Sequence, residues 1–331
     1  MKNKVKYGQF YTKNAEYIIG NLIEDLDKNK VIVEPFCGEG DLLLFNNKVE
    51  LYDIDPKLEN CVQRDTLKDV PDYKDKLVVT NPPFLAKNKN TDKSIYDLYN
   101  VGDLYKAAIK SILKCDGGII IIPLNFFCDE DNNIRNIFFE NFNILKLNIF
   151  EETVFDDTSY TICSFLFEKK TDNIITETKI VFFPSKEEKI ITFSKSSSYK
   201  IGSDFIEIIE TQENIGIGRL QLGGNPNSNL YLRAIDTGSE DGRINLSINK
   251  KPFFGKISDR TFATITMDKK YTEAEEKFIC LKFNQILEEN RKKYNSLFLT
   301  AYRNSSSSYS RKRISFDVAY KLISYIVKTF L

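Results

Sequence analysis

The sequence predicts an α/β protein: a doubly wound, mostly parallel sheet followed by a second α+β domain. In the first half of the chain, short continuous runs of apolar and β-branched residues alternate with stretches of helical spacing. This alternation is typical of parallel strands that helices cover on both faces. After about residue 170 the runs become shorter and the sequence between them more charged. We therefore expect one domain over residues 1–170 and another over residues 171–331.

The expected elements of the first domain follow one another in regular order. Apolar residues at helical spacing predict helices over residues 15–26 and 104–113. Short apolar runs predict buried strands over residues 31–33, 49–54, 77–79, 119–122, 144–150 and 161–167. In a sheet of this class ligands bind at the carboxyl ends of the strands. The residues that directly follow these runs are therefore the first candidates for a site.

The second half mixes short β-like pieces with long helical patterns. Residues 180–183 and 190–193 are β-like, residues 194–198 form a serine-rich loop, and a Gly-Gly-Asn-Pro-Asn turn occupies residues 223–227. Helical spacing returns over residues 272–289 and 316–330. This mixture predicts an α+β domain with its own core.

Composition excludes several classes of protein. The 331 residues include no histidine, which excludes Ser-His and Cys-His hydrolases and histidine-ligated metals. The six cysteines contain no Cys-x-x-Cys pair, so we expect no metal site, no disulfide framework and a cytoplasmic, reducing setting. No apolar run approaches the roughly 18 residues of a membrane span, and no P-loop motif occurs. Basic and acidic residues balance at 47 each, so a nucleic-acid partner must be inferred from local clusters of charge.

The most specific motif is Asn81-Pro82-Pro83-Phe84, which directly follows a predicted strand. Two prolines fix the backbone and remove two N–H donors, so the Asn81 side-chain oxygen and the Pro82 carbonyl form an edge that only accepts hydrogen bonds. Such an edge can hold both hydrogens of one amino group, such as N6 of adenine, and direct its lone pair at an electrophilic methyl. Phe84 offers a flat face for the base. The structural alternative is a rigid turn that leaves a strand.

Two further motifs also follow predicted strands. The segment Glu34-Pro35-Phe36-Cys37-Gly38-Glu39-Gly40 has two glycines that let a bulky cofactor approach the backbone. Leu43 occupies the place of the third glycine in Gly-x-Gly-x-x-Gly, which favours a nucleoside cofactor without a pyrophosphate. Asp53 ends the next strand, where a carboxylate can accept both ribose hydroxyls. Either acid could instead be a solvated strand end.

Together these residues resemble the amino-methyltransferases, in particular the DNA adenine-N6 methyltransferases of restriction-modification systems, with cofactor motifs first and a target-recognition region last. The resemblance covers roughly the first half of the chain and implies a Rossmann-like methyltransferase fold. It begins at Gly8-Gln9-Phe10-Tyr11-Thr12, where Lys13 replaces the family's proline. It continues through the motifs above and through residues 64–67, 117–126, 154–157 and 161–167.

The resemblance implies S-adenosyl-L-methionine as cofactor, double-stranded DNA as substrate and a cognate restriction endonuclease as a functional partner. The implied cofactor residues are Thr12, Glu34, Phe36, Gly38, Asp53 for the ribose and Asp65 for the adenine. The implied catalytic residues are Asn81, Pro82 and Phe84. Phe84 and Phe155 are expected to stack on a flipped-out adenine. For Phe155 the structural alternative is a core side chain, since the chain has 25 phenylalanines.

The C-terminal segment concentrates positive charge. From Arg291 to Leu331 nine basic residues stand against one acid, Asp317. Hydroxyls and basic side chains both bind phosphate oxygens, and Ser305 to Ser308 lie within this segment. We therefore expect contacts with the DNA backbone from Arg303, Arg311, Lys312 and Arg313. The alternative is a flexible polar loop before a final helix.

Other functions share parts of this pattern. RNA adenine methyltransferases carry Asn-Pro-Pro-Phe, and protein-glutamine methyltransferases carry Asn-Pro-Pro-Tyr. The opening motif and the large C-terminal region favour DNA, because a reader of duplex DNA needs a second domain to span the groove and extrude a base. A non-catalytic DNA-binding or specificity partner that has kept the fold is a further alternative. The intact Asn81 motif, Asp53 and paired glycines argue against it.

Overall fold

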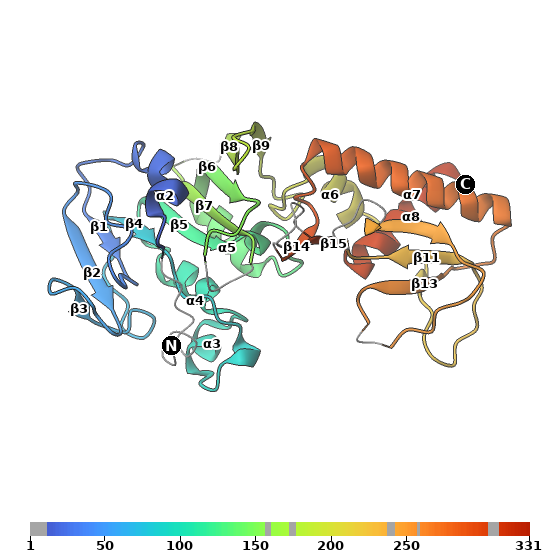
Figure 1. The fold of residues 1–331 in the computed structure, drawn as a ribbon, viewed down its shortest axis with the longest axis horizontal. Helices are drawn as coiled ribbons and strands as arrows, with labels where there is room; N and C mark the ends of the chain where they lie inside the picture. The colour runs from blue at the N-terminus through green and yellow to red at the C-terminus, as the bar shows by residue number, and fades with distance from the viewer. Residues whose placement is uncertain (1–11, 156–159, 172–176, 237–241, 257–258, 304–310) are drawn as a thin grey trace. The chain divides into compact units, whose positions relative to one another are not determined.

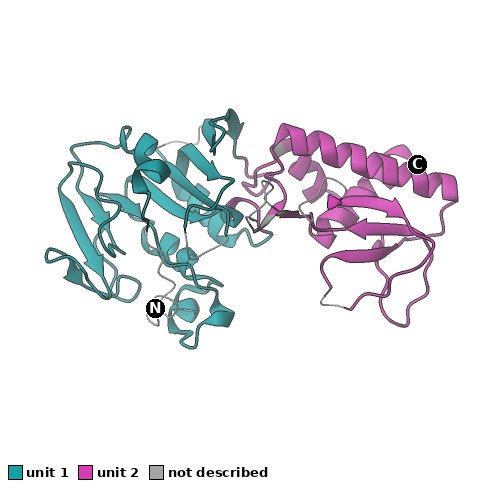
Figure 2. Cartoon of the chain, viewed as in Figure 1, with its two compact units in different colours: residues 1–126, 130–193 teal, residues 127–129, 194–331 magenta. Residues whose placement is uncertain are grey.

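The computed structural model describes residues 12–155, 160–171, 177–236, 242–256, 259–303 and 311–331. It divides into two compact units, shown in Figure 2: unit 1 comprises residues 1–126 and 130–193, and unit 2 residues 127–129 and 194–331. Unit 1 thus extends past the predicted boundary near residue 170, because the two strands at 177–192 pair with its sheet. No helix among the described residues is long and apolar enough to cross a membrane.

Unit 1 is built on a nine-stranded sheet (Figure 1). Its strands are β1 (Ile32–Glu34), β2 (Val49–Asp53), β3 (Val62–Gln63), β4 (Leu77–Thr80), β5 (Gly117–Pro123), β6 (Phe142–Phe150), β7 (Ile162–Lys169), β8 (Glu177–Phe183) and β9 (Glu188–Thr192). They lie in the order β3-β2-β1-β4-β5-β7-β6-β8-β9. β7 runs antiparallel between β5 and β6, and β9 runs antiparallel to β8. The other pairs are parallel.

The predicted fold class is confirmed for this unit. Every strand expected in the first half is present, and β4 and β5 are buried at every position, as strands covered on both faces must be. The helices are α2 (Ala15–Ile23), α3 (Ser94–Tyr99), α4 (Leu104–Ser111) and α5 (Asn133–Asn141), with 3₁₀ turns at Lys87–Lys89 and Leu124–Phe127. α2 contacts β5 and β7, and α5 contacts β6. α3 and α5 were not predicted.

The described residues of unit 2 form a four-stranded antiparallel sheet and three helices, as expected of an α+β domain. The sheet order is β10 (Gly218–Arg219), β13 (Phe262–Thr266), β11 (Leu230–Arg233) and β12 (Asn245–Ile248). The helices are α6 (Ser203–Glu210), α7 (Glu273–Lys293) and α8 (Phe316–Phe330), and β14 (Thr300–Arg303) pairs antiparallel with β15 (Arg311–Arg313). The predicted helices at 272–289 and 316–330 are confirmed as α7 and α8. A capping box between Thr272 and Glu275 begins α7.

Candidate functional site

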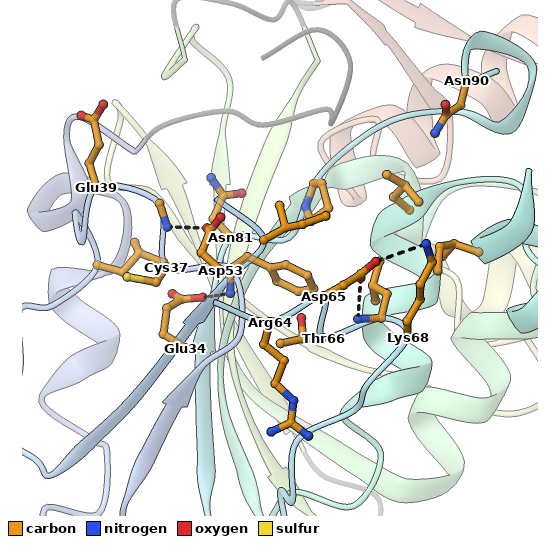
Figure 3. A pocket seen from close by; sticks show the side chains of 18 of the residues that line it. Glu34, Cys37, Glu39, Asp53, Arg64, Asp65, Thr66, Lys68, Asn81 and Asn90 are labelled. Carbon is orange, nitrogen blue, oxygen red and sulfur yellow. Dashed lines mark hydrogen bonds and ion pairs between the residues drawn. The ribbon is translucent and has the colours of Figure 1, made fainter. Parts of the chain in front are cut away.

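A cavity of about 370 Å³ opens where the parallel strands of unit 1 end (Figure 3). Glu34 ends β1, Asp53 ends β2, and Asn81 follows β4. Because these strands run parallel, their carboxyl ends meet at one edge of the sheet. The cavity brings together seven of the predicted site residues: Thr12, Glu34, Phe36, Gly38, Asp53, Asp65 and Asn81.

Glu34 lies at the floor of this cavity, almost fully buried. Its Oε1 accepts hydrogen bonds from the Phe36 N–H, at 3.1 Å, and from the Thr80 hydroxyl, at 2.7 Å. Burial raises the pKa of Glu34 to about 8, although both hydrogen bonds favour the carboxylate. The side chain is therefore held in place, and its charge state near neutral pH responds to any charge that enters the cavity.

Asp53 is fixed by the loop that surrounds it. Its Oδ2 accepts from the Gly38 N–H and its Oδ1 from the Asp55 N–H, each at 2.8 Å. Gly38 has φ +55°, a left-handed conformation that glycine adopts without steric cost. A carboxylate has about four acceptor positions. Asp53 can therefore accept two ligand hydroxyls in addition to these two N–H groups.

The lining of the cavity is acidic. Glu34, Glu39, Asp41, Asp53, Asp65 and Asp92 line it, together with the bases Arg64 and Lys68. Both bases have acidic partners: Arg64 Nε lies 2.8 Å from Asp69, and Lys68 Nζ lies 3.6 Å from Asp65. A cavity with this balance favours a cationic ligand that carries hydroxyl and amino donors. It disfavours a ligand with phosphates.

Asn81 is tied to the start of the described chain. Its amide nitrogen donates to the Thr12 hydroxyl at 3.0 Å, and Thr12 is buried. This bond joins two predicted motifs that are 69 residues apart. It engages the amide nitrogen with Thr12, and the amide oxygen is the group that accepts hydrogen bonds. The strand that precedes Asn81, β4, lies very close to β5. At Gly118 of β5, which has φ +143°, a Cβ atom would lie 1.8 Å from the Val78 carbonyl oxygen of β4, so only glycine fits there.

The two predicted stacking residues lie apart from the cavity lining. Phe84 is 5% exposed and packs edge-on against Tyr105, with ring centroids 6.3 Å apart. Phe155 is 3% exposed. Pro83 lines the cavity, whereas neither phenylalanine does. A stacking role therefore requires the rings to move, and for both residues it stays a prediction.

The basic C-terminal segment is less open than the sequence suggested. Arg291 is buried, and its guanidinium binds Asp236 at 2.5 and 3.2 Å. Lys312 is only 5% exposed, which leaves little of its side chain for the predicted contact with the DNA backbone, whereas Arg313 is partly exposed. The side chains of Arg303 and Arg311 lie outside the described residues, as do the predicted segments 8–11, 156–157 and 304–310.

Sequence reasoning missed part of the cavity. Residues 90–92, in the segment before α3, and Ile95, within α3, also line it, and no pattern in the sequence indicated them. Asp41 lines the cavity as well. Burial raises the pKa of Asp41, and a hydrogen bond from the Thr12 backbone partly offsets this increase. A second cavity of about 640 Å³ shares Thr12 and Asp41 with the first. Among the described residues no group of three or more acids or cysteines could hold a metal.

No protein-family model matches the chain. Solved structures that are similar to part of it include a type I restriction-modification methyltransferase subunit from Streptococcus thermophilus, with 17% identity, a TM-score of 0.40 and coverage of 54% of this chain and 48% of that chain. They also include DrdV in complex with DNA, with 12% identity, a TM-score of 0.45 and coverage of 71% and 36%. The 23S rRNA methyltransferase ErmE has 14% identity, a TM-score of 0.34 and coverage of 46% and 68%. The chain thus spans about half or less of the first two structures.

Proposed function

We propose that the chain is an S-adenosyl-L-methionine-dependent methyltransferase that methylates N6 of adenine in DNA. The observation that carries this proposal is the Asn81–Thr12 hydrogen bond, which joins the Asn-Pro-Pro motif to Thr12 in the lining of an acidic cavity. The fold supports it, since the sheet is Rossmann-like and β7 runs antiparallel between β5 and β6.

The residues of the cavity fit this cofactor. S-adenosyl-L-methionine supplies an electrophilic methyl group on a positively charged sulfur, and its nucleoside carries ribose hydroxyls and an adenine amino group. Asp53 would accept from the hydroxyls, and Asp65 would accept from the amino group. Buried Glu34 would favour a cation, since a nearby positive charge stabilises its carboxylate. Thr12, Phe36 and Gly38 complete the lining.

The Asn81 motif would act on the acceptor of the methyl group. Because the Asn81 nitrogen donates to Thr12, its oxygen and the Pro82 carbonyl are the atoms that would accept from an amino group. Two such bonds hold the amino nitrogen with its lone pair directed at the methyl. The second cavity is lined by Thr12, the hydrogen-bond partner of Asn81, and we propose that it admits the substrate.

Unit 2 would provide target recognition, with a restriction endonuclease of the same specificity as functional partner. Its separate core of helices packed on a sheet can present a surface independently of the catalytic unit. RNA is the alternative substrate, because the acceptor edge at Asn81 would hold the amino group of an RNA adenine equally well. A non-catalytic specificity partner is disfavoured, because it has no chemical need for the Asn81–Thr12 bond.

The test is to offer labelled S-adenosyl-L-methionine with duplex DNA, structured RNA or protein to the full chain. The label should appear in duplex DNA. Label only in RNA or only in protein would reassign the substrate, whereas cofactor binding without transfer to any of the three would favour the non-catalytic alternative.

A further inference from the structure

The sheet of unit 2 has two chemically different faces. Along β11 the buried residues Leu230 and Leu232 alternate with the partly exposed Tyr231 and Arg233. The buried set belongs to the core that contains residues of α6, α7 and α8, and α7 runs beside the sheet (Figure 1). Because side chains alternate along a strand, Tyr231 and Arg233 lie on the opposite face. We call this the outer face.

Aromatic and basic side chains stack on the outer face. Arg233 is paired in register with Phe262 of β13. Its guanidinium carbon lies 5.5 Å from the centroid of the Phe262 ring, and the Tyr231 ring stacks on Phe262 at 5.7 Å and 11°. A guanidinium that stacks on a ring keeps its N–H groups available at its edge and loses less conformational freedom when it binds an oxyanion.

Arg313 lies on the same face. β15 continues alongside the end of β11: the Asp236 N–H donates to the Lys312 carbonyl and the Ile314 N–H to the Ala234 carbonyl, both at 3.0 Å. Ile235 and Arg313 are bridge partners, so their side chains share a face. Ile235 is two residues after Arg233 and therefore also on the outer face. The same alternation turns Lys312 inward, which accounts for its burial.

Positive charge continues into the loops beside this face. The loop over residues 249–255 lies against it: the Phe253 N–H donates to the Thr264 hydroxyl at 2.8 Å, and its ring meets Tyr231 edge-on at 6.4 Å. Lys250 and Lys251 in this loop are exposed. By contrast, α7 on the other side of the sheet begins with Glu273, Glu275 and Glu276. Over its whole length α7 is neutral, with five acids and five bases, so the helix does not share the positive excess of the outer face and its loop.

We propose that the outer face is the surface with which unit 2 binds duplex DNA, with Arg233 and Arg313 on phosphate oxygens and Lys250 and Lys251 at its edge. The occupant follows from charge complementarity, since a polyanion matches a row of arginines flanked by lysines. This inference rests on the proposed function. The expected DNA contacts are then Arg233 of β11 and Arg313 of β15, which point outward from two neighbouring strands, and not the whole run at 311–313.

The test compares variants that remove equal charge from different sides of unit 2. Arg233→Gln combined with Arg313→Gln should weaken binding of a fluorescent duplex and lower the slope of log affinity against log salt by about 1.8, or about 0.9 per phosphate contact. The matched control is Arg243→Gln combined with Lys277→Gln. Arg243 pairs with Glu288 of α7 at 3.3 Å and Lys277 with Glu273 at 2.9 Å, on the helical side. The control should keep the wild-type slope.

A second double variant, Lys250→Gln with Lys251→Gln, changes only exposed loop residues. It tests the same surface if the variant with both arginines replaced fails to fold. It should also lower the slope. Wild-type affinity and slope in both outer-face pairs, or an equal loss in the helical-side control, would overturn the proposal. Cofactor binding and methyl transfer by the wild-type chain are measured in parallel. Transfer to DNA with unchanged binding by the variants refutes the surface alone, whereas no transfer to DNA refutes the proposed function.

Discussion

Replacement of Glu34 by glutamine should change how the stability of the protein depends on pH. The pKa of Glu34 is raised by burial from its ordinary value of 4.5 to about 8. The folded state therefore keeps this proton over a pH range in which the unfolded chain has lost it. Stability contributed by the protonated group is fully present below the unfolded pKa and declines as the pH rises toward 8. The decline is about 1.4 kcal/mol per pH unit within that window.

Glu34→Gln mimics the protonated carboxyl and cannot ionise, so this part of the pH dependence should disappear. The free energy of unfolding of the variant, relative to the wild type, should rise between pH 5 and pH 8 and level off above. The assay is denaturant unfolding of the full chain across this range. Hydrogen exchange of the amides of β1 and β4 monitors the cooperative unfolding of unit 1. Glu39→Gln, at an exposed acid of the same loop, controls for the loss of one carboxylate. Parallel pH curves for Glu34→Gln and the wild type would refute the inference that burial dominates at this carboxyl.

Three further predictions concern the cofactor, the target base and the core of unit 2. Asp53→Ala should weaken S-adenosyl-L-methionine binding at least tenfold by calorimetry, because each charge-assisted bond to a hydroxyl contributes about 1.5–3 kcal/mol; an unchanged Kd would move the pocket elsewhere. Phe155→Ala should slow methylation of paired adenine more than that of adenine opposite a mismatch, where extrusion costs less, whereas equal slowing would mean that Phe155 only fills the core. Arg291→Met should lower the stability of unit 2 by about 3–5 kcal/mol in thermal unfolding, because it leaves Asp236 buried without its ion pair, and a loss below about 1 kcal/mol would contradict this.

The strands that position the site could be predicted because each one is a local signal. β4 consists of three apolar residues and Thr80, and Asn81-Pro82 follows directly, so adjacent residues indicate both the strand and its end. β8 and β9 were recognised as β-like but assigned to the second domain. Their composition is charged, and their place in the sheet is fixed by the pairing of Lys179 with Lys146 across a long stretch of chain, which no local pattern records.

The site residues divide in the same way. Polar residues at or just after strand ends were expected to form the site because parallel strands bring their carboxyl ends together, and Glu34, Asp53 and Asn81 do line one cavity. The family resemblance implied that Thr12 lines the cofactor pocket, but its bond to Asn81 was not predicted, since nothing local links residues so far apart. Lys312 shows the limit of reading charge alone: three adjacent bases look like one surface, but alternation along β15 turns the middle one inward.

The most direct test of the proposed chemistry is nucleoside analysis of duplex DNA after incubation with S-adenosyl-L-methionine and either the wild-type chain or Asn81→Ala. Wild-type protein should produce N6-methyl-2′-deoxyadenosine. Asn81→Ala should produce none while keeping cofactor affinity close to the wild type, because the Asn81 oxygen acts on the target nitrogen. Methylation of another base, no methylation of DNA by the wild type, or near-normal product from Asn81→Ala would contradict the assignment of this cavity and its Asn-Pro-Pro edge as an adenine methylation site.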